Sequence, residues 1–239
     1  MSSALAQGLD SQGFEFLLYN PTRAKAEGLA RRLKNAELWQ GQSFDVVVLG
    51  FKPQKLSEAM EELTSLIKPE TLVLSLLAGV KLEKLQRHFG PRVIRLMPNL
   101  AIAQGSGVCL WSSPLDKKDN AFWQKSLNAL GFAPSVSEPE LDLYTLHAGC
   151  SPAYMYFLIH EMKELAQRAG GDPALAAKIL TLSLQGVLGQ LTGEEDFKAL
   201  ISQVASKGGV TEATLSHWQE SGAISQGLEA GLKRIQQLS

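Results

Sequence analysis

The first 140 residues alternate short apolar runs with amphipathic segments, and this alternation limits the folds open to the chain. The run Asp45-Val-Val-Val-Leu-Gly50 is almost continuously apolar and β-branched, which is typical of a strand buried on both faces of a sheet. Strands that alternate with helices predict a doubly wound parallel sheet with right-handed crossovers. Further strands are predicted at 14–19, 71–76, 92–97 and 107–111, and helices at 23–33, 55–67, 80–89 and 119–130.

From Leu141 onward the sequence shows helical periodicity and no strand pattern. Two segments, 153–159 and 174–182, are apolar around much of the helix circumference, so each is expected to be buried on more than one side. In a helical region of this size such breadth predicts a subunit interface, and hence a homodimer or a larger homo-oligomer. The predicted helices span 141–168, 173–191, 194–204, 211–219 and 223–238.

Composition excludes several classes of function. The formal net charge is −1, with 23 basic and 24 acidic residues dispersed along the chain, so there is no basic footprint for nucleic acid. The two cysteines, Cys109 and Cys150, provide neither a disulfide framework nor a metal-ligand cluster, and no metal is expected. No apolar run reaches membrane-spanning length, and the first residues are not typical of a signal peptide. We therefore expect a cytoplasmic protein with no membrane partner.

Candidate ligand residues follow the predicted strands. In an open parallel sheet, ligands bind beyond the carboxyl ends of the strands. Asn20 and Arg23 stand where an acidic residue would hold a ribose 2′-hydroxyl, and an arginine there accommodates a 2′-phosphate, which favours NADP while leaving NAD possible. The alternative for Arg23 is a solvated charge in the first turn of a helix. The other candidates in these turns are Phe51, Lys52, Pro53, Ala78, Gly79, Met97 and Asn99.

The loop Ser206-Lys-Gly-Gly-Val-Thr211 interrupts the helical half. Its two glycines permit backbone angles closed to other residues, and Thr211 is expected to be the N-cap of the next helix. A Gly-Gly turn that leads into a helix presents free N–H groups to an anion, so the loop is a candidate site for a carboxylate or phosphate. The alternative is a plain loop and cap between two helices.

Taken together, these segments resemble the pyrroline-5-carboxylate reductase family, in its order and spacing from Met1 to Ser239. The resemblance implies a Rossmann-type dinucleotide-binding domain over 1–140 and a helical substrate and dimerisation domain over 141–239. It also implies NADPH-dependent reduction of 1-pyrroline-5-carboxylate to proline. The segments that carry it are 45–54, 75–80, 95–99, 149–154 and 206–211.

The resemblance also implies roles for individual residues. Thr211 aligns with the proposed proton donor near the imine nitrogen, and Glu194 with an acidic residue near the substrate amine. The alternative for Glu194 is a helix-start charge. Ser2 and Ser3 align with the end of the phosphate-binding turn. The residues implied to bind the substrate carboxylate are Ser206, Gly208, Gly209, Val210 and Thr211.

The sequence departs from the family pattern in several places. Lys207 replaces a proline, Cys150 a serine and Ser151 a glycine, and the first strand with its Gly-x-Gly turn has no counterpart before Met1. Either Met1 is an internal methionine of a longer gene product, or the chain is a paralogue that does not hold the cofactor in the usual way. Two other functions therefore stay open: a non-catalytic binding protein, and a reductase of another small imine or keto acid.

Overall fold

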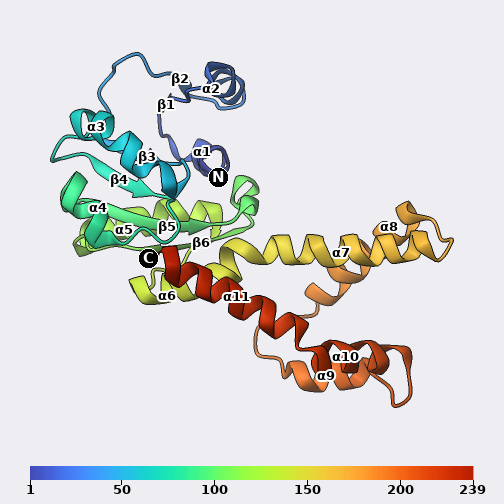
Figure 1. Ribbon diagram of the computed structural model, residues 1–239. Helices are drawn as coiled ribbons and strands as arrows, with labels where there is room; N and C mark the ends of the chain where they lie inside the picture. Colours follow the sequence, from blue (N-terminus) through green and yellow to red (C-terminus); the bar gives the residue numbers. More distant parts are fainter. Residues whose placement is uncertain (239) are drawn as a thin grey trace. The chain divides into compact units, whose positions relative to one another are not determined.

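The computed structural model describes residues 1–238, which form two compact units (Figure 1). The first unit contains Met1–Cys150 together with the chain from Leu232 onward, and the second contains Ser151–Gly231. All of the strands among the described residues lie in the first unit. The α/β class predicted for the N-terminal part and the helical class predicted for the C-terminal part are both confirmed.

The main sheet has five strands in the order β3-β4-β5-β6-β7. β3, β4 and β5 are parallel to one another, and β7 is parallel to β6. β6 runs antiparallel to β5, which corrects the expectation of an entirely parallel sheet. The physical reason is the short connection, because a 3₁₀ turn at Leu100–Gln104 cannot replace the crossover that a parallel neighbour requires. The strands span Val46–Leu49, Leu72–Ser75, Val93–Pro98, Gly107–Ser112 and Gly131–Phe132.

A second, two-stranded parallel sheet consists of β1 (Phe16–Leu18) and β2 (Ala36–Leu38), joined through α2 (Arg23–Ala30). Among the described residues, neither β1 nor β3 has a hydrogen-bonded strand on its other edge. The side chain of Phe16 nevertheless packs against the main core, so the small sheet belongs to the same unit. The strand β2 is absent from the sequence prediction because three residues with a central Glu37 carry no readable periodicity.

The core of the first unit lies on both faces of the main sheet. Alternate residues of β4 point to opposite faces, so Leu72 and Leu74 belong to one cluster and Val73 to the other. The first cluster is covered by α1 (Ser2–Leu9) and α5 (Lys117–Leu127). The second is covered by α3 (Leu56–Leu66) and α4 (Leu82–Phe89). Burial on both faces explains why β4 and β5 are almost continuously apolar rather than alternating. The expectation that 45–50 is buried on both faces is wrong, because β3 lies at the edge of the sheet and its Val48 is exposed.

The single helix predicted at 141–168 is wrong in its continuity. A capping box at Ser137 and Glu140 starts α6 (Glu138–Leu143), a π-helical turn follows at Leu146–Cys150, and α7 (Ser151–Arg168) then begins. Pro152 lies two residues after the π-helical turn, and a proline cannot donate the backbone hydrogen bond that a regular helix interior would require there. The remaining helices are α8 (Pro173–Leu188), α9 (Phe197–Val204), α10 (Val210–Ser221) and α11 (Ala223–Leu238).

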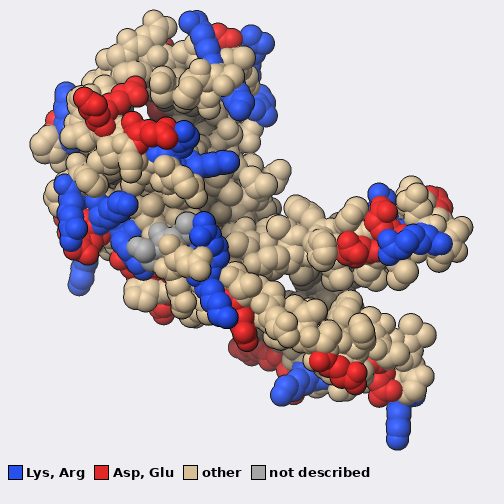
Figure 2. Space-filling view, in the orientation of Figure 1, with Lys and Arg blue, Asp and Glu red and all other residues tan. Residues whose placement is uncertain are grey.

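Within one copy of the chain, the described residues of the second unit form no buried core. None of its described residues is buried, although α7 and α8 pack against each other. Large apolar side chains are exposed along these helices, including Tyr156 at 67% and Leu188 at 65%. Figure 2 shows few charged side chains along the first half of α7. Such a surface requires a partner. Among the described residues, no helix is both long and apolar enough to cross a membrane.

Candidate functional site

The carboxyl ends of three parallel neighbours bring three of the predicted ligand turns to one edge of the main sheet. The turn after β3 holds Phe51, Lys52 and Pro53, the turn after β4 holds Ala78 and Gly79, and the end of β5 holds Met97 and Asn99. Because β3, β4 and β5 are hydrogen-bonded in register, these turns follow one another along the edge. The edge is therefore a candidate dinucleotide site.

Gly79 is buried and has a φ of 75°, a conformation that favours glycine. The side-chain oxygen of Asn99 accepts hydrogen bonds from the backbone N–H groups of Ala101 at 3.2 Å and Val108 at 3.3 Å. Asn99 therefore fixes the chain that leaves β5, which is a structural role that the sequence did not indicate. Met97 is buried at the same edge.

The start of α1 reaches this edge as well. The Ser2 hydroxyl donates a hydrogen bond to the carbonyl oxygen of Gly50 at 3.2 Å, directly after β3. A Cβ atom added to Gly50 would lie 1.7 Å from the Ser2 Oγ, so only glycine permits this approach. The first turn of α1 contains no acidic residue, and Ser3 in that turn is exposed. The positive end of this short helix is thus open to an anion.

The fourth predicted turn belongs to the small sheet. Asn20 and Arg23 follow β1, which is not hydrogen-bonded to the main sheet. The Asn20 Oδ1 accepts from the backbone N–H of Thr22 at 2.9 Å, and the Arg23 Nε donates to the Glu27 Oε1 at 2.8 Å. The Arg23 side chain is 79% exposed, so its pair with Glu27 lies in solvent and contributes little to stability.

A cluster of charges around the buried Arg95 lies beside these turns, and it was not predicted from the sequence. The Arg95 guanidinium on β5 is 2% exposed and donates to the Glu138 Oε1 at 2.6 Å and the Asp142 Oδ1 at 2.7 Å. Lys81 pairs with the second carboxylate oxygen of Asp142. Burial alone would raise the pKa of Asp142, but hydrogen bonds from Lys81 and Arg95 outweigh it and hold the pKa below its ordinary value. The one available signal was an arginine inside an otherwise apolar strand.

The predicted substrate loop lies in the second unit, at the start of α10. The helix begins at Val210 with Gly209 as its N-cap, so the prediction that Thr211 is the cap is wrong. Gly208 has a φ of 73°, and its backbone N–H donates to the Glu212 Oε2 at 2.6 Å. The N–H of Gly209 donates to the carbonyl oxygen of Ser206 at 2.9 Å. One backbone N–H of the loop is therefore directed at a carboxylate, and that carboxylate is a side chain of the chain itself.

Glu194 is exposed in the loop that precedes α9. The neighbouring carboxylate, Glu195, is the one with ordered partners. Its Oε2 accepts from the N–H of Gly193 at 2.9 Å and its Oε1 accepts from the Thr192 hydroxyl at 2.7 Å. Hydrogen bonds from the backbone and side chain of Thr192 lower the pKa of Glu195 to about 2.

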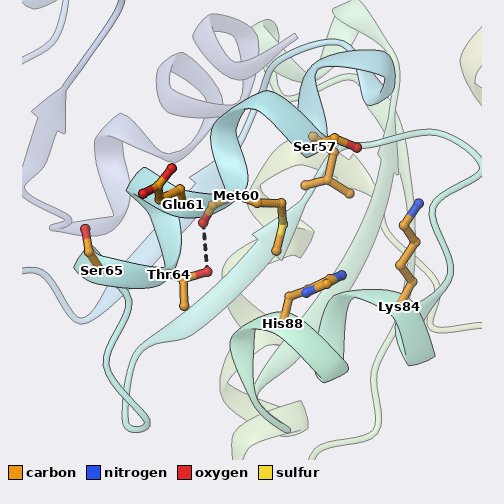
Figure 3. A pocket seen from close by; sticks show the side chains of 8 residues that line it. Ser57, Met60, Glu61, Thr64, Ser65, Lys84 and His88 are labelled. Carbon is orange, nitrogen blue, oxygen red and sulfur yellow. Dashed lines mark hydrogen bonds between the residues drawn. The ribbon is translucent and has the colours of Figure 1, made fainter.

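A cavity of about 730 Å³ lies between α3 and α4, and none of its lining residues is a predicted site residue (Figure 3). His88 and Lys84 from α4 face Met60 from α3, and the Thr64 hydroxyl donates to the carbonyl oxygen of Met60 at 2.7 Å. With both Lys84 and Glu61 in its lining, the cavity has no single-sign charge that would select a ligand. The remaining lining residues are Leu56, Ser57 and Ser65.

Comparison with known proteins gives one consistent family. Residues 138–238 match the family model described as pyrroline-5-carboxylate reductase dimerisation. Pyrroline-5-carboxylate reductase 2 of Bacillus subtilis is 35% identical over 74% of this chain and 65% of its own length. Pyrroline-5-carboxylate reductase 1 of the same organism is 32% identical over 83% of this chain and 69% of its own length. The chain thus spans about two thirds of the length of these curated relatives.

Two solved structures share the fold. The 1-pyrroline-5-carboxylate reductase of Streptococcus pyogenes superimposes with a TM-score of 0.86 at 23% identity, covering 100% of this chain and 94% of that one. The Plasmodium falciparum pyrroline carboxylate reductase, solved with NADP bound, gives a TM-score of 0.82 at 20% identity, covering 100% and 95%. The resemblance and the fold class read from the sequence are confirmed.

Proposed function

Because this chain belongs to the pyrroline-5-carboxylate reductase family of oxidoreductases, we propose that it reduces 1-pyrroline-5-carboxylate to proline with a nicotinamide dinucleotide. The observation that carries the proposal is the sheet edge at which three ligand turns and the start of α1 meet. In open α/β sheets that edge is where dinucleotides bind. The cofactor would supply the hydride when bound.

The described residues fit a dinucleotide in two respects. The start of α1 lies beside Gly50 with no acidic residue in its first turn, which suits a diphosphate, and the turns at Phe51–Pro53 and Ala78–Gly79 offer backbone groups beyond it. Ser2 and Ser3 would lie at the phosphates. We propose NADPH rather than NADH because Arg23 is exposed after β1 and no acidic residue replaces it. The NADP-bound P. falciparum relative supports the same choice.

The loop at 206–211 would hold the substrate carboxylate through the N–H groups around Val210 and Thr211 and the Ser206 hydroxyl. Thr211, in the first turn of α10, would hold or pass the proton that reaches the ring nitrogen. Glu194 would lie near the substrate amine. These side chains contribute position and electrostatics rather than strong acid catalysis.

Assembly is the remaining part of the proposal. A homodimer joined through the second unit would cover its exposed apolar helices, and higher homo-oligomers are compatible with the same interface.

The test is a turnover assay on the purified full-length chain with 1-pyrroline-5-carboxylate and NADPH, followed by loss of cofactor absorbance and by detection of proline. We expect proline to form in equal amount to the NADPH consumed. Cofactor binding without turnover would favour the non-catalytic binding protein, and turnover with only another cyclic imine or a keto acid would favour the other reductase. A Lys207→Pro variant restores the family residue. If the variant is active and the wild type is not, Lys207 blocks the pocket; if neither is active, the chain lacks the activity.

A further inference from the structure

The cluster of Lys81, Arg95, Glu138 and Asp142, which we name the charge cluster, has no place in the chemistry proposed so far. It contains two cations and two carboxylates, so its formal charge balances. Arg95 is 2% exposed and Asp142 12% exposed. Buried ion pairs of this kind are costly to desolvate, and apolar side chains often give equal or greater stability. The stability of the fold alone therefore does not explain why the charge cluster is present. Its geometry offers an explanation.

The cluster joins α6 to two segments that lie 43 to 61 residues earlier in the sequence. The Glu138 Oε1, on α6, accepts from Arg95 on β5 and also from the backbone N–H of Leu82 at 2.7 Å, at the start of α4. Asp142, one turn later on α6, joins Arg95 to Lys81. The middle of β5, the start of α4 and the whole of α6 are thus fixed to one another.

Each of these segments leads directly into the candidate dinucleotide edge. Lys81 lies two residues after Gly79, and Arg95 lies two residues before Met97. On the other side, α6 leads into the π-helical turn, where a Cβ atom added to Gly149 would lie 3.3 Å from the Met97 sulfur. Displacing α6 would therefore move the turn at Ala78–Gly79 and the packing around Met97 together.

We propose that Arg95, held between Glu138 and Asp142, is a positioning residue that sets the Ala78–Gly79 turn and the end of β5 in register for the dinucleotide. The inference rests on the proposed function for the identity of the ligand. The arrangement of the three segments is given by the contacts described above and does not depend on the proposed function. A guanidinium that bridges two carboxylates is suited to this task because its N–H donors have fixed directions in one plane.

The experiment compares Arg95→Met and Arg95→Lys with Arg92→Met in the full-length chain. Arg92 is the matched control because it also forms an ion pair, with Asp119 at 3.0 Å, but precedes the opposite end of β5. Three quantities are measured: the Kd for NADPH by titration calorimetry, thermal stability, and amide hydrogen exchange of the peptide spanning 76–85. Asp142→Asn and Glu138→Gln, which each leave Arg95 one partner, serve if Arg95→Met does not fold.

We expect Arg95→Met to weaken NADPH binding by about 10- to 100-fold, the loss in affinity that is typical when the hydrogen-bonded partners that orient a metal ligand are removed. Exchange in 76–85 should be faster, and Arg95→Lys should recover part of both effects. Arg92→Met should lower stability but leave Kd and that exchange unchanged. Wild-type Kd and wild-type exchange in a folded Arg95 or Asp142 variant would overturn the inference. If the wild type binds no NADPH, the proposed function fails, and the exchange measurement still decides whether the cluster sets the turn.

Discussion

The carboxylate of Glu212 accepts a hydrogen bond at 2.6 Å from the backbone N–H of Gly208, inside the loop proposed to hold the substrate carboxylate. A negatively charged ligand at this loop must therefore compete with a side chain of the chain itself. Replacing that carboxylate removes both the competing acceptor and the repulsion between two negative charges.

Glu212→Ala should tighten the binding of a carboxylate ligand such as proline by about 10-fold, since a hydrogen bond to a charged group is worth about 1.5–3 kcal/mol. Titration calorimetry with proline and with prolinamide checks this, because the amide should gain nothing. Glu220→Ala, at the exposed end of the same helix, is the control. Unchanged or weaker proline binding in Glu212→Ala would contradict the prediction.

The Thr211→Ala variant should show whether Thr211 stabilises the start of the helix or takes part in catalysis. The N-cap of α10 is Gly209, so loss of the Thr211 hydroxyl should change the free energy of unfolding by no more than about 0.5 kcal/mol. If Thr211 positions the transferred proton, turnover should fall by about 100-fold. Thr214→Ala is the control, because that hydroxyl bonds the carbonyl oxygen of Val210 on the same helix. Equal turnover in both variants would remove Thr211 from the mechanism.

Arg23→Ala should weaken NADPH binding by about 10-fold and leave NADH binding unchanged, because only the former cofactor has a 2′-phosphate for the guanidinium. The solvent-exposed pair of Arg23 with Glu27 opens at little cost. Fluorescence titrations of both cofactors measure the effect, with Lys25→Ala on the same helix as the control. Parallel losses for NADPH and NADH would count against a contact with the 2′-phosphate.

Acid should weaken the first unit through Asp142. The pKa of this carboxyl is lowered in the folded state, so its stabilising effect is present above the unfolded value of about 3.9 and is lost as the pH falls through the folded value. Urea unfolding between about pH 5 and pH 2 should show a shallower loss of stability in Asp142→Asn than in the wild type. Glu83→Gln, which removes an exposed partner of Arg87, should follow the wild-type curve.

The chain should be a dimer or larger at low micromolar concentration, because the second unit buries none of its described residues by itself. Light scattering should show no monomer. Tyr156→Asp, on the exposed apolar surface of α7, should shift the chain toward monomer or lower its melting temperature, since it places a charge in the interface. Phe122→Asp, at an exposed aromatic of the first unit, should leave the assembly unchanged. A stable wild-type monomer would be incompatible with this interface.

The strands that could be predicted best are those with a nearly continuous apolar sequence. β4 and β5 are apolar at nearly every position because both faces are covered, and β3 is equally apolar although its Val48 is exposed. The three predicted ranges contain the observed ones apart from Pro98. β2 and β7 were not predicted, because β2 has an exposed Glu37 at its centre and β7 is only two residues long. The direction of β6 follows from the connection before it, not from its own residues.

The candidate site also has parts that could be predicted from the sequence and parts that could not. Three turns could be placed at one edge because parallel neighbours end together, whereas the turn with Arg23 belongs to a sheet whose separation no local sequence encodes. Arg95 was visible as a charge inside an apolar strand, but its partners lie 43 and 47 residues away. Pairings at that distance depend on the packing of α6. The prediction of one continuous helix over 141–168 did not identify α6 as a separate helix.

Two of the edge strands in the described part of the chain, β1 and β3, also affect how the chain will behave at high concentration. Each has one side without a strand partner among residues 1–238, and an unpaired strand edge can capture an extended segment of another molecule. Val48 on β3 is 39% exposed, so that edge is apolar as well as unpaired. Aggregation is therefore expected to begin at these strands rather than at the helices. Lysine placed on β3 should improve the soluble yield without affecting the subunit interface.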